Sequence, residues 1–266
     1  MEHEFSRTEL LIGTEGLEKL RQRTVLIFGI GGVGSYTVEA LARSAIGHLI
    51  LVDFDEISIS NLNRQIHALH STIGEAKVEV MKRRILEVNS RAQVETLKEF
   101  LSADNVHHFL DRRPDYVVDA IDTVSSKVIL VKECLSRKIP LISSMGAGNR
   151  LTAENFKVTD ISKTSGDPLA KTMRKLLRQE GITKGVKVVS STEPPLTPLP
   201  SLSQQTLPTK DAVHLDTDPS DETTSKTTKR HTPGSISFVP SVVGLLIAGE
   251  VVRDLLESPT SIRTRT

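Results

Sequence analysis

Four glycines within six residues give the sequence its clearest capacity for chemistry. Gly29, Gly31, Gly32 and Gly34 follow directly on the apolar residues 25–28, and residues 35–44 have the composition of a helix. Glycine permits a tight turn in which main-chain N–H groups at a helix N-terminus approach an anionic phosphate. The pattern therefore predicts a phosphate-binding turn, and a strand-to-helix turn that binds nothing is the alternative.

Charged side chains follow at intervals that suit a nucleotide. Asp53 comes after the apolar run 48–52, about twenty residues beyond the glycines, where a carboxylate accepts hydrogen bonds from ribose hydroxyls. Arg64 and Lys77 supply positive charge, and Asp122 ends another apolar run. Reaction at a phosphate needs such charges. The alternatives are a surface arginine, a solvated lysine on a helix and a helix-capping aspartate.

The elements that must position these residues alternate along the chain. Helical spacing is found at 14–21, 35–44, 75–88 and 127–138, and strand-like runs at 24–28, 48–52, 93–97, 115–122 and 140–144. This alternation predicts an α/β fold with a doubly wound, mostly parallel sheet of Rossmann type and flanking helices. Ligands of such sheets bind beyond the carboxyl ends of the strands, where the glycines, Asp53 and Asp122 fall.

The C-terminal part of the chain changes composition twice. Residues 190–231 are dominated by Ser, Thr, Pro, Asp and Lys, which predicts a disordered insertion. Ser241 is the predicted N-cap of a C-terminal helix over residues 242–256, and residues 257–266 are a predicted flexible tail. The apolar run 242–252 is too short to cross a bilayer and contains Glu250, so we expect a buried helix and no membrane partner.

The overall composition narrows the possible partners. The chain has 266 residues and a formal net charge of +1, so its total charge indicates neither nucleic acid nor a membrane surface. The single cysteine, Cys134, excludes an intramolecular disulfide and an all-cysteine zinc site, and its apolar neighbours predict a buried structural thiol. His67 and His70 lack further metal-binding partners, which favours structural or loop roles. No secretory signal is recognisable, so we expect a cytoplasmic protein.

Taken together, these residues resemble the ubiquitin-activating-enzyme-like (ThiF/MoeB/HesA) adenylyltransferase superfamily over nearly the whole chain. The segments that carry the resemblance are 29–34, 53–55, 60–65, 74–77 and 119–122. Segments 4–13, 63–68, 144–149 and 163–165 resemble the tRNA threonylcarbamoyladenosine dehydratase branch within it. The resemblance implies a single ThiF-like nucleotide-binding domain over residues 1–256, interrupted by the insertion at 190–231.

The resemblance also implies a reaction, with ATP and Mg²⁺ as cofactors and a modified adenosine in tRNA as substrate. The threonylcarbamoyl carboxylate is adenylated, and attack from within the same nucleoside closes a ring with loss of AMP. Arg64 and Lys77 would neutralise phosphates, Asp122 would hold the metal ion, and Arg7 would reach the nucleotide of the partner subunit in a homodimer. The implied nucleotide contacts are Gly29, Gly31, Gly32, Gly34, Asp53, Asp55, Ser60, Asn61, Arg64, Lys77, Asp122 and Thr123.

A tRNA substrate predicts a local patch of positive charge. Residues 163–187 hold seven basic and two acidic side chains, and the Asp-Pro pair at 167–168 predicts the start of a helix. Four basic residues on one face of this helix are the candidate nucleic-acid contacts: Lys171, Arg174, Lys175 and Arg178. A solvated amphipathic helix is the alternative.

Three other functions remain open at this stage. An activator of a small ubiquitin-like sulfur-carrier protein shares the ATP site but needs a thiol or a partner that the sequence does not display. An NAD-dependent oxidoreductase accounts for the glycines and Asp53 but leaves Arg64, Lys77 and Asp122 without a role. The third is a nucleotide-binding scaffold without catalysis. A sulfur-relay or other protein partner is compatible with each ATP-dependent function.

Overall fold

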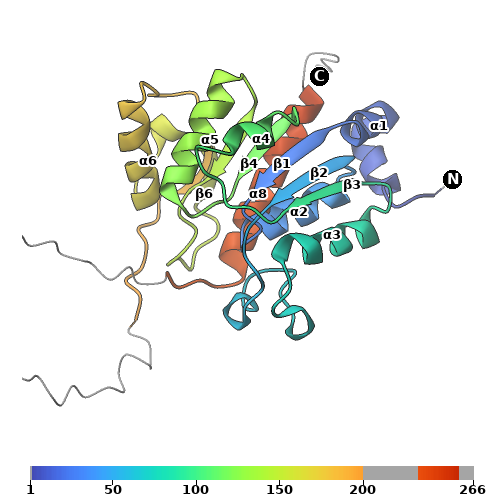
Figure 1. The fold of residues 1–266 in the computed structure, drawn as a ribbon, viewed down its shortest axis with the longest axis horizontal. Coiled ribbons are helices and arrows are strands. Elements are labelled where there is room, and N and C mark those ends of the chain that lie inside the picture. The colour runs from blue at the N-terminus through green and yellow to red at the C-terminus, as the bar shows by residue number, and fades with distance from the viewer. Residues whose placement is uncertain (1, 200–232, 258–266) are drawn as a thin grey trace, which may run out of the picture.

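One sheet with helices on both faces organises the protein (Figure 1), and the computed structural model describes residues 2–199 and 233–257. Within these residues seven strands follow the order β3-β2-β1-β4-β5-β7-β6. All neighbouring pairs are parallel except the antiparallel pair of β6 and β7. The strands are β1 (Thr24–Phe28), β2 (His48–Val52), β3 (Gln93–Leu97), β4 (Tyr116–Asp119), β5 (Leu141–Ser144), β6 (Phe156–Asp160) and β7 (Lys187–Ser191). The predicted doubly wound, mostly parallel sheet is confirmed.

The strand order predicts where a ligand binds. From β1 the chain runs outward to β2 and β3, and then returns to continue on the other side of β1 with β4 and β5. The order therefore reverses between β1 and β4. In doubly wound sheets the crevice at this reversal, beyond the carboxyl ends of the strands, is where ligands bind.

The helices divide between the two faces of the sheet (Figure 1). One face packs against α1 (Ser6–Arg21), α2 (Gly34–Arg43), α3 (Lys77–Val88) and α8 (Phe238–Glu257). The other face packs against α4 (Val106–Leu110), α5 (Val124–Ser136) and α6 (Pro168–Gln179). Short 3-10 helices are η1 (Ile59–Asn61), η2 (His70–Thr72) and η3 (Ile161–Lys163). No helix in the described parts of the chain combines the length and apolar character needed to cross a membrane.

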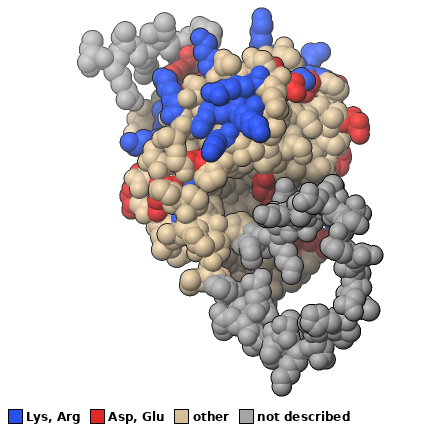
Figure 2. Space-filling model, turned by 90° about the vertical axis from the view of Figure 1, so that its left-hand side faces the viewer, with Lys and Arg blue, Asp and Glu red and all other residues tan. Residues whose placement is uncertain are grey.

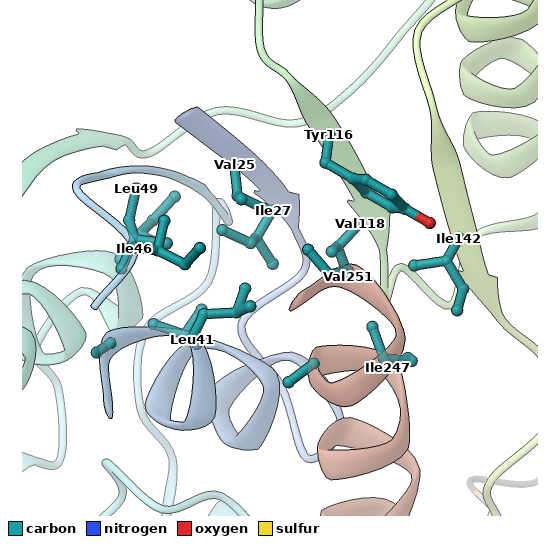
Figure 3. Packing of buried hydrophobic residues seen from close by; sticks show 14 of the residues in the cluster. Val25, Ile27, Leu41, Ile46, Leu49, Tyr116, Val118, Ile142, Ile247 and Val251 are labelled. Carbon is teal, nitrogen blue, oxygen red and sulfur yellow. The ribbon is translucent and has the colours of Figure 1, made fainter. Parts of the chain in front are cut away.

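The alternation of side chains along β1 explains this division. Val25 and Ile27 belong to the core shared with α2 and α8 (Figure 3), whereas Leu26 and Phe28 belong to the core beneath α4 and α5. Successive side chains of a strand point to opposite faces, so a strand covered on both sides is apolar throughout. Cys134 is buried in the second core, as predicted, and burial raises the pKa of its thiol to about 12.

Three element boundaries differ from the sequence predictions. The helix predicted over 14–21 is α1, which begins at Ser6 and bends at Gly13, where φ is +73°. The C-terminal helix begins at Phe238, so Ser241 lies inside it and its hydroxyl donates to the Phe238 carbonyl oxygen rather than capping the N-terminus. The early start is possible because a proline, here Pro240, is tolerated in the first turn of a helix. The strand predicted to end at Asp122 ends at Asp119.

The start of the predicted insertion also needs correction. Ser190 and Ser191 belong to β7, where they pair with Lys157 and Phe156 of β6. Polar side chains are compatible with this position because β7 ends at the ligand crevice. Residues 192–199 form no helix or strand. The remaining residues of the predicted insertion, 200–231, and residues 258–266 of the predicted tail lie outside the described residues.

Candidate active site

A cavity of about 540 Å³ lies at the carboxyl ends of the central strands. Its lining falls into two groups of segments. We call residues 28–33, 52–55, 61–65 and 77 the first wall, and residues 144–150, 167–169, 195 and 233–235 the second wall. Residues 99–101, 120–122, 126 and 240 complete the lining. The cavity therefore occupies the crevice that the reversal of strand order predicts.

Most of the candidate site residues line this cavity. Nine of them do so: Gly29, Gly31, Gly32, Asp53, Asp55, Asn61, Arg64, Lys77 and Asp122. Gly34, Ser60, Thr123 and Arg7 are not among the lining residues. The sequence pattern thus brings a glycine-rich turn, three carboxylates and two cations into one cavity.

The glycine-rich turn is held by close backbone contacts. A Cβ atom on Gly29, whose φ is +84°, would lie 2.6 Å from the Ala120 carbonyl oxygen, and one on Gly34 would lie 1.8 Å from the Gly29 carbonyl oxygen. Gly34 therefore lets α2 pack tightly on the turn. A Cβ atom on Gly32 would lie 3.3 Å from Cγ of Arg64, so this glycine keeps open the side of the turn that faces the arginine.

Asp53 fixes the turn to the end of β2. Its Oδ2 accepts a hydrogen bond of 2.6 Å from the Ile30 amide, and its Oδ1 accepts one of 2.9 Å from the Asp55 amide. Burial raises the pKa of Asp53, and the nearby charge of Lys77 opposes that rise. The carboxylate thus holds the backbone of the cavity and contributes to its lining.

Lys77 places a buried cation on the first wall. Its Nζ donates to Oδ2 of Asp55 at 2.6 Å and lies 4.0 Å from Oδ1 of Asp53. Lys77 is the first residue of α3, where the helix dipole disfavours a positive charge. Its position is therefore unfavourable for the helix and suits an anionic ligand.

Arg64 and Asn61 lie on the loop between β2 and α3. The Arg64 guanidinium donates through Nη1 to the Ser60 carbonyl oxygen and to Oδ1 of Asn63, and partial burial lowers its pKa below the usual value. Oδ1 of Asn61 accepts from the Ser58 amide, which leaves its amide NH₂ as the group that can donate to a ligand. Ser60 contributes to this loop by accepting the hydrogen bond from Arg64 with its carbonyl oxygen.

Asp122 is an exposed carboxylate on the cavity lining, three residues beyond the end of β4. Oγ1 of Thr123 donates to its Oδ1 at 3.4 Å, so Thr123 contacts the aspartate and not the cavity. Arg7 is exposed on α1 and contributes nothing to the cavity of its own chain.

A fully buried ion pair lies at the end of β4, beside the cavity lining. Nζ of Lys127 is 2.9 Å from Oδ1 of Asp119, and the Ser143 hydroxyl donates to Oδ2 at 2.6 Å. The Ile121 amide also donates to Asp119. These bonds tie the loop that carries Asp122 to α5 and β5. No sequence signal announces this role of Asp119, because an aspartate at a strand end does not reveal its partners.

The second wall contains polar residues that the sequence analysis did not assign to the site. Asp167 caps α6 by accepting from the Ala170 amide, which confirms the predicted helix start, and it also accepts from the Gly146 amide and the Ser190 hydroxyl. Arg150 is 3% exposed and donates through Nε to the Gly146 carbonyl oxygen. The four segments of this wall are far apart in sequence, so no local motif announces them.

Asn149 joins the remaining segments of the second wall. It has φ of +58°, and its side-chain and main-chain groups bond Gly234 at 2.6 and 2.8 Å. Its carbonyl oxygen accepts from the Leu196 amide. The two described stretches on either side of residues 200–232 therefore meet at one residue on the cavity rim.

A group of basic side chains lies on the outer face of α6, whose first residues, Pro168 and Leu169, line the cavity. Figure 2 shows lysine and arginine side chains gathered on this side of the molecule. Three of the four predicted contacts are exposed, namely Lys171, Lys175 and Arg178. Arg174 is half-buried and donates to the Thr164 carbonyl oxygen and hydroxyl, so part of its donor capacity is already used.

His67 and His70 are not part of a metal-binding cluster within the described residues, since neither belongs to a group of three or more potential ligands there. His67 is buried with no hydrogen-bond partner for either ring nitrogen, and burial, aided by the charges of Lys77 and Arg84, lowers its pKa to about 4. A neutral structural histidine agrees with the sequence interpretation.

Comparisons with known proteins show which family, relatives and solved structures this chain resembles. The model of the ThiF family matches residues 5–266. The chain is 48% identical over 257 residues to tRNA threonylcarbamoyladenosine dehydratase of Bacillus subtilis (strain 168), covering 97% of this chain and 96% of the relative. It is 41% identical to the dehydratase of the same name from Escherichia coli (strain K12), covering 71% and 73%. The solved structure of E. coli tRNA N6-threonylcarbamoyladenosine dehydratase, TcdA, in complex with ATP matches with a TM-score of 0.81 and 32% identity, covering 96% of this chain and 94% of that one.

Proposed function

The chain belongs to the ThiF family, and we propose that it is an ATP-dependent tRNA threonylcarbamoyladenosine dehydratase. The observation that carries this function is the 48% identity, over almost the full length of both chains, to a dehydratase of that name. The cavity agrees with it, because a glycine-rich turn, two cations and a free carboxylate meet there. The enzyme adenylates the threonylcarbamoyl carboxylate of the modified adenosine and then closes the ring with release of AMP.

The first wall is the proposed ATP site. The main-chain N–H groups of the turn at Gly29–Gly34 would contact the phosphates, with Arg64 and Lys77 neutralising their charge. Asp53 and Asp55 would face the ribose, and the Asn61 amide would orient phosphate oxygens. A related dehydratase structure contains ATP, and another contains AMP, which supports a nucleotide in the corresponding crevice here.

Mg²⁺ is proposed to bind between Asp122 and the nucleotide phosphates. No group of three or more His, Cys, Asp or Glu ligands is assembled among residues 2–199 and 233–257, so these side chains alone form no complete cage. Mg²⁺ commonly takes one or two carboxylates together with substrate phosphates, and the exposed Asp122 on the cavity lining fits that donor set. When bound, the ion would offset charge on the phosphate oxygens.

The second step needs no enzyme thiol. Cys134 is buried in the core beneath α4 and α5, and the raised pKa of about 12 keeps it protonated at neutral pH. A thioester on this residue is therefore disfavoured. Attack on the activated carboxylate from within the same nucleoside closes the ring and expels AMP, so the substrate itself supplies the nucleophile.

The basic face of α6 is the proposed tRNA contact. Its exposed residues are Lys171, Lys175 and Arg178, and the N-terminal end of the helix reaches the cavity. A tRNA backbone lying along this face would bring a modified nucleoside toward the second wall. A cytoplasmic location is part of the proposal.

A homodimer is proposed to complete the site. Leu10 and Leu11 on α1 are each 86% exposed, and the same helix carries Arg7. Exposed leucines of this kind favour a protein contact. Packing of α1 on a second copy would let Arg7 approach that copy's nucleotide. Binding experiments with the purified dimer would test for a sulfur-relay or other protein partner.

The experiment that tests this function measures AMP release from ATP and Mg²⁺, with tRNA that does or does not carry threonylcarbamoyladenosine. We expect AMP only with the modified tRNA, and a product nucleoside lighter by one water. AMP release driven by a small carrier protein would replace this function with that of a sulfur-carrier activator. Binding of NAD without binding of ATP would favour an oxidoreductase.

A further inference from the structure

Arg150 is a buried arginine on the second wall that has unused hydrogen-bonding capacity. Its Nε donates to the Gly146 carbonyl oxygen, but its Nη1 is buried without any hydrogen-bond partner in the described structure. The side chain is 1% exposed, and the residue lines the cavity. A buried N–H group without a partner costs stability, so the arrangement favours a hydrogen-bond acceptor on a bound ligand.

Among the described residues, Arg150 has one ion-pair partner, Asp167, but donates no hydrogen bond to it. The nearest carboxylate oxygen is Oδ2 of Asp167 at 3.7 Å, which is too long for a hydrogen bond. The same carboxylate already accepts from the Gly146 amide, the Ala170 amide and the Ser190 hydroxyl. The Phe156 ring, 5.7 Å from the guanidinium carbon, contacts the cation without neutralising it. Arg150 is therefore paired with Asp167 by charge alone, and its guanidinium keeps N–H donors for an anionic ligand.

The position of Arg150 points to a part of the substrate other than ATP. The phosphate-binding features, namely the glycine-rich turn, Arg64 and Lys77, belong to the first wall. Arg150 belongs to the second wall together with Asp167 at the start of α6. An anion bound by Arg150 would thus share the cavity with the nucleotide while contacting different residues.

We propose that the Arg150 guanidinium binds the carboxylate of the threonylcarbamoyl group and so selects modified over unmodified tRNA. This inference rests on the proposed function, which supplies the carboxylate. A guanidinium forms charge-assisted hydrogen bonds with carboxylates and remains charged when buried. Bound there, the carboxylate is held in the cavity that also holds ATP, ready for attack on the α-phosphate.

The test compares Arg150→Met with Arg112→Met in the full-length protein. Methionine keeps much of the arginine's length and removes its charge. Arg112 is a matched control because it is a partly buried arginine paired with Glu95 and does not line the cavity. Affinity is measured for ATP, for tRNA carrying threonylcarbamoyladenosine, and for the same tRNA with unmodified adenosine. Thermal melting of each variant reports folding.

We expect Arg150→Met to bind the modified tRNA about 10- to 100-fold more weakly, the range for one hydrogen bond to a charged group. Its affinities for ATP and for unmodified tRNA should match those of Arg112→Met. An unchanged preference for modified tRNA would overturn the proposal. So would a loss of ATP affinity equal to the loss of tRNA affinity, because Arg150 would then bind a phosphate.

A second measurement keeps the test decisive if Arg150→Met does not fold. Wild-type protein is given tRNA in which the threonylcarbamoyl carboxylate is converted to its methyl ester, and Arg150→Lys is given the acid. The ester should bind wild-type protein about 10- to 100-fold more weakly than the acid does. Arg150→Lys, which keeps the charge, should bind the acid more weakly than wild-type protein does, but by a smaller factor. Equal binding of acid and ester overturns the inference. If wild-type protein releases no AMP with modified tRNA, the proposed function itself fails, which is a separate result.

Discussion

The two walls of the cavity are built in opposite ways. The first wall comes from segments that follow β1 and β2 and from the first residue of α3, and its buried cation is paired, with Nζ of Lys77 2.6 Å from Oδ2 of Asp55. The second wall joins segments from 144 to 235, and it contains Arg150 with an unpartnered Nη1. The difference suggests that the first wall is preformed for a nucleotide, whereas the second wall is completed by a substrate.

The largest expected effect belongs to the first wall and the adjoining Asp122. Arg64→Ala and Asp122→Ala should each lower ATP–pyrophosphate exchange, measured with modified tRNA, by about 10³-fold or more, since each removes charge stabilisation at the reacting phosphates. Both variants should fold, because neither residue is buried in the core.

Arg83→Ala and Asp104→Ala are suitable controls, because both residues are exposed and neither lines the cavity. These controls should retain wild-type exchange. Wild-type exchange in Arg64→Ala or Asp122→Ala would remove that residue from the reaction and would leave the first wall with a purely structural role.

The next largest effect concerns tRNA binding by the basic face of α6, beside the second wall. Replacing Lys171, Lys175 and Arg178 together by Gln should weaken tRNA binding about 10- to 100-fold and reduce the salt dependence by about one unit of slope per residue, because each loses a phosphate contact. ATP affinity should stay constant. The measurement is tRNA affinity as a function of salt concentration. If Gln at Lys82 and Arg83 on α3 has the same effect, α6 is not the specific contact.

The stability of the folded protein should depend on pH through His67, which is buried behind the first wall. The pKa of His67 is about 4 in the folded protein, below its ordinary 6.5, so the unfolded chain takes up a proton first as the pH falls. Stability from this group is present above pH 6.5 and is lost between pH 6.5 and 4, by up to ~3 kcal/mol. Denaturant midpoints at pH 7 and 4.5 should therefore differ less in His67→Leu than in wild-type protein.

The difference in pH dependence isolates His67, because every other titrating group is common to both chains. The absolute stability of His67→Leu is not needed for this comparison. Equal changes in midpoint for the two proteins would show that His67 does not titrate differently on unfolding.

The first wall could be predicted from the sequence because its signals are local. Glycines, Asp53, Arg64 and Lys77 lie at fixed distances from strand ends, and the alternation of apolar runs places those ends at one edge of the sheet. The resemblance of the same segments to a known superfamily added roles to the residues. Gly34 shows the limit of this reasoning. Its spacing in the motif is equally compatible with ligand contact and with close packing, and the structure shows close packing.

The second wall could not be predicted in the same way. Asp167 signals a helix start, and only the fold shows that its carboxylate also bonds Gly146 and Ser190. Arg150 has no sequence signal, because its burial depends on Phe156 and Asp167 from other segments. The boundary error at residue 190 has a related cause, since the composition of Ser190 and Ser191 resembles the polar stretch that follows while their pairing with β6 places them in the sheet.

The smallest expected effect comes from shortening the chain beside the second wall. Removing residues 200–231 and joining the ends through a short Gly-Ser linker should leave AMP formation within about two-fold of wild type, because polar segments of this composition add little to a core. A short linker is sufficient, since Leu196 and Gly234 both bond Asn149. Removing 190–231 instead should abolish folding or activity, because it deletes Ser190, which bonds Asp167, and Ser191 of β7. If the shorter deletion is equally damaging, residues 200–231 contribute to the second wall, and the contrast between the walls would be greater than the described residues show.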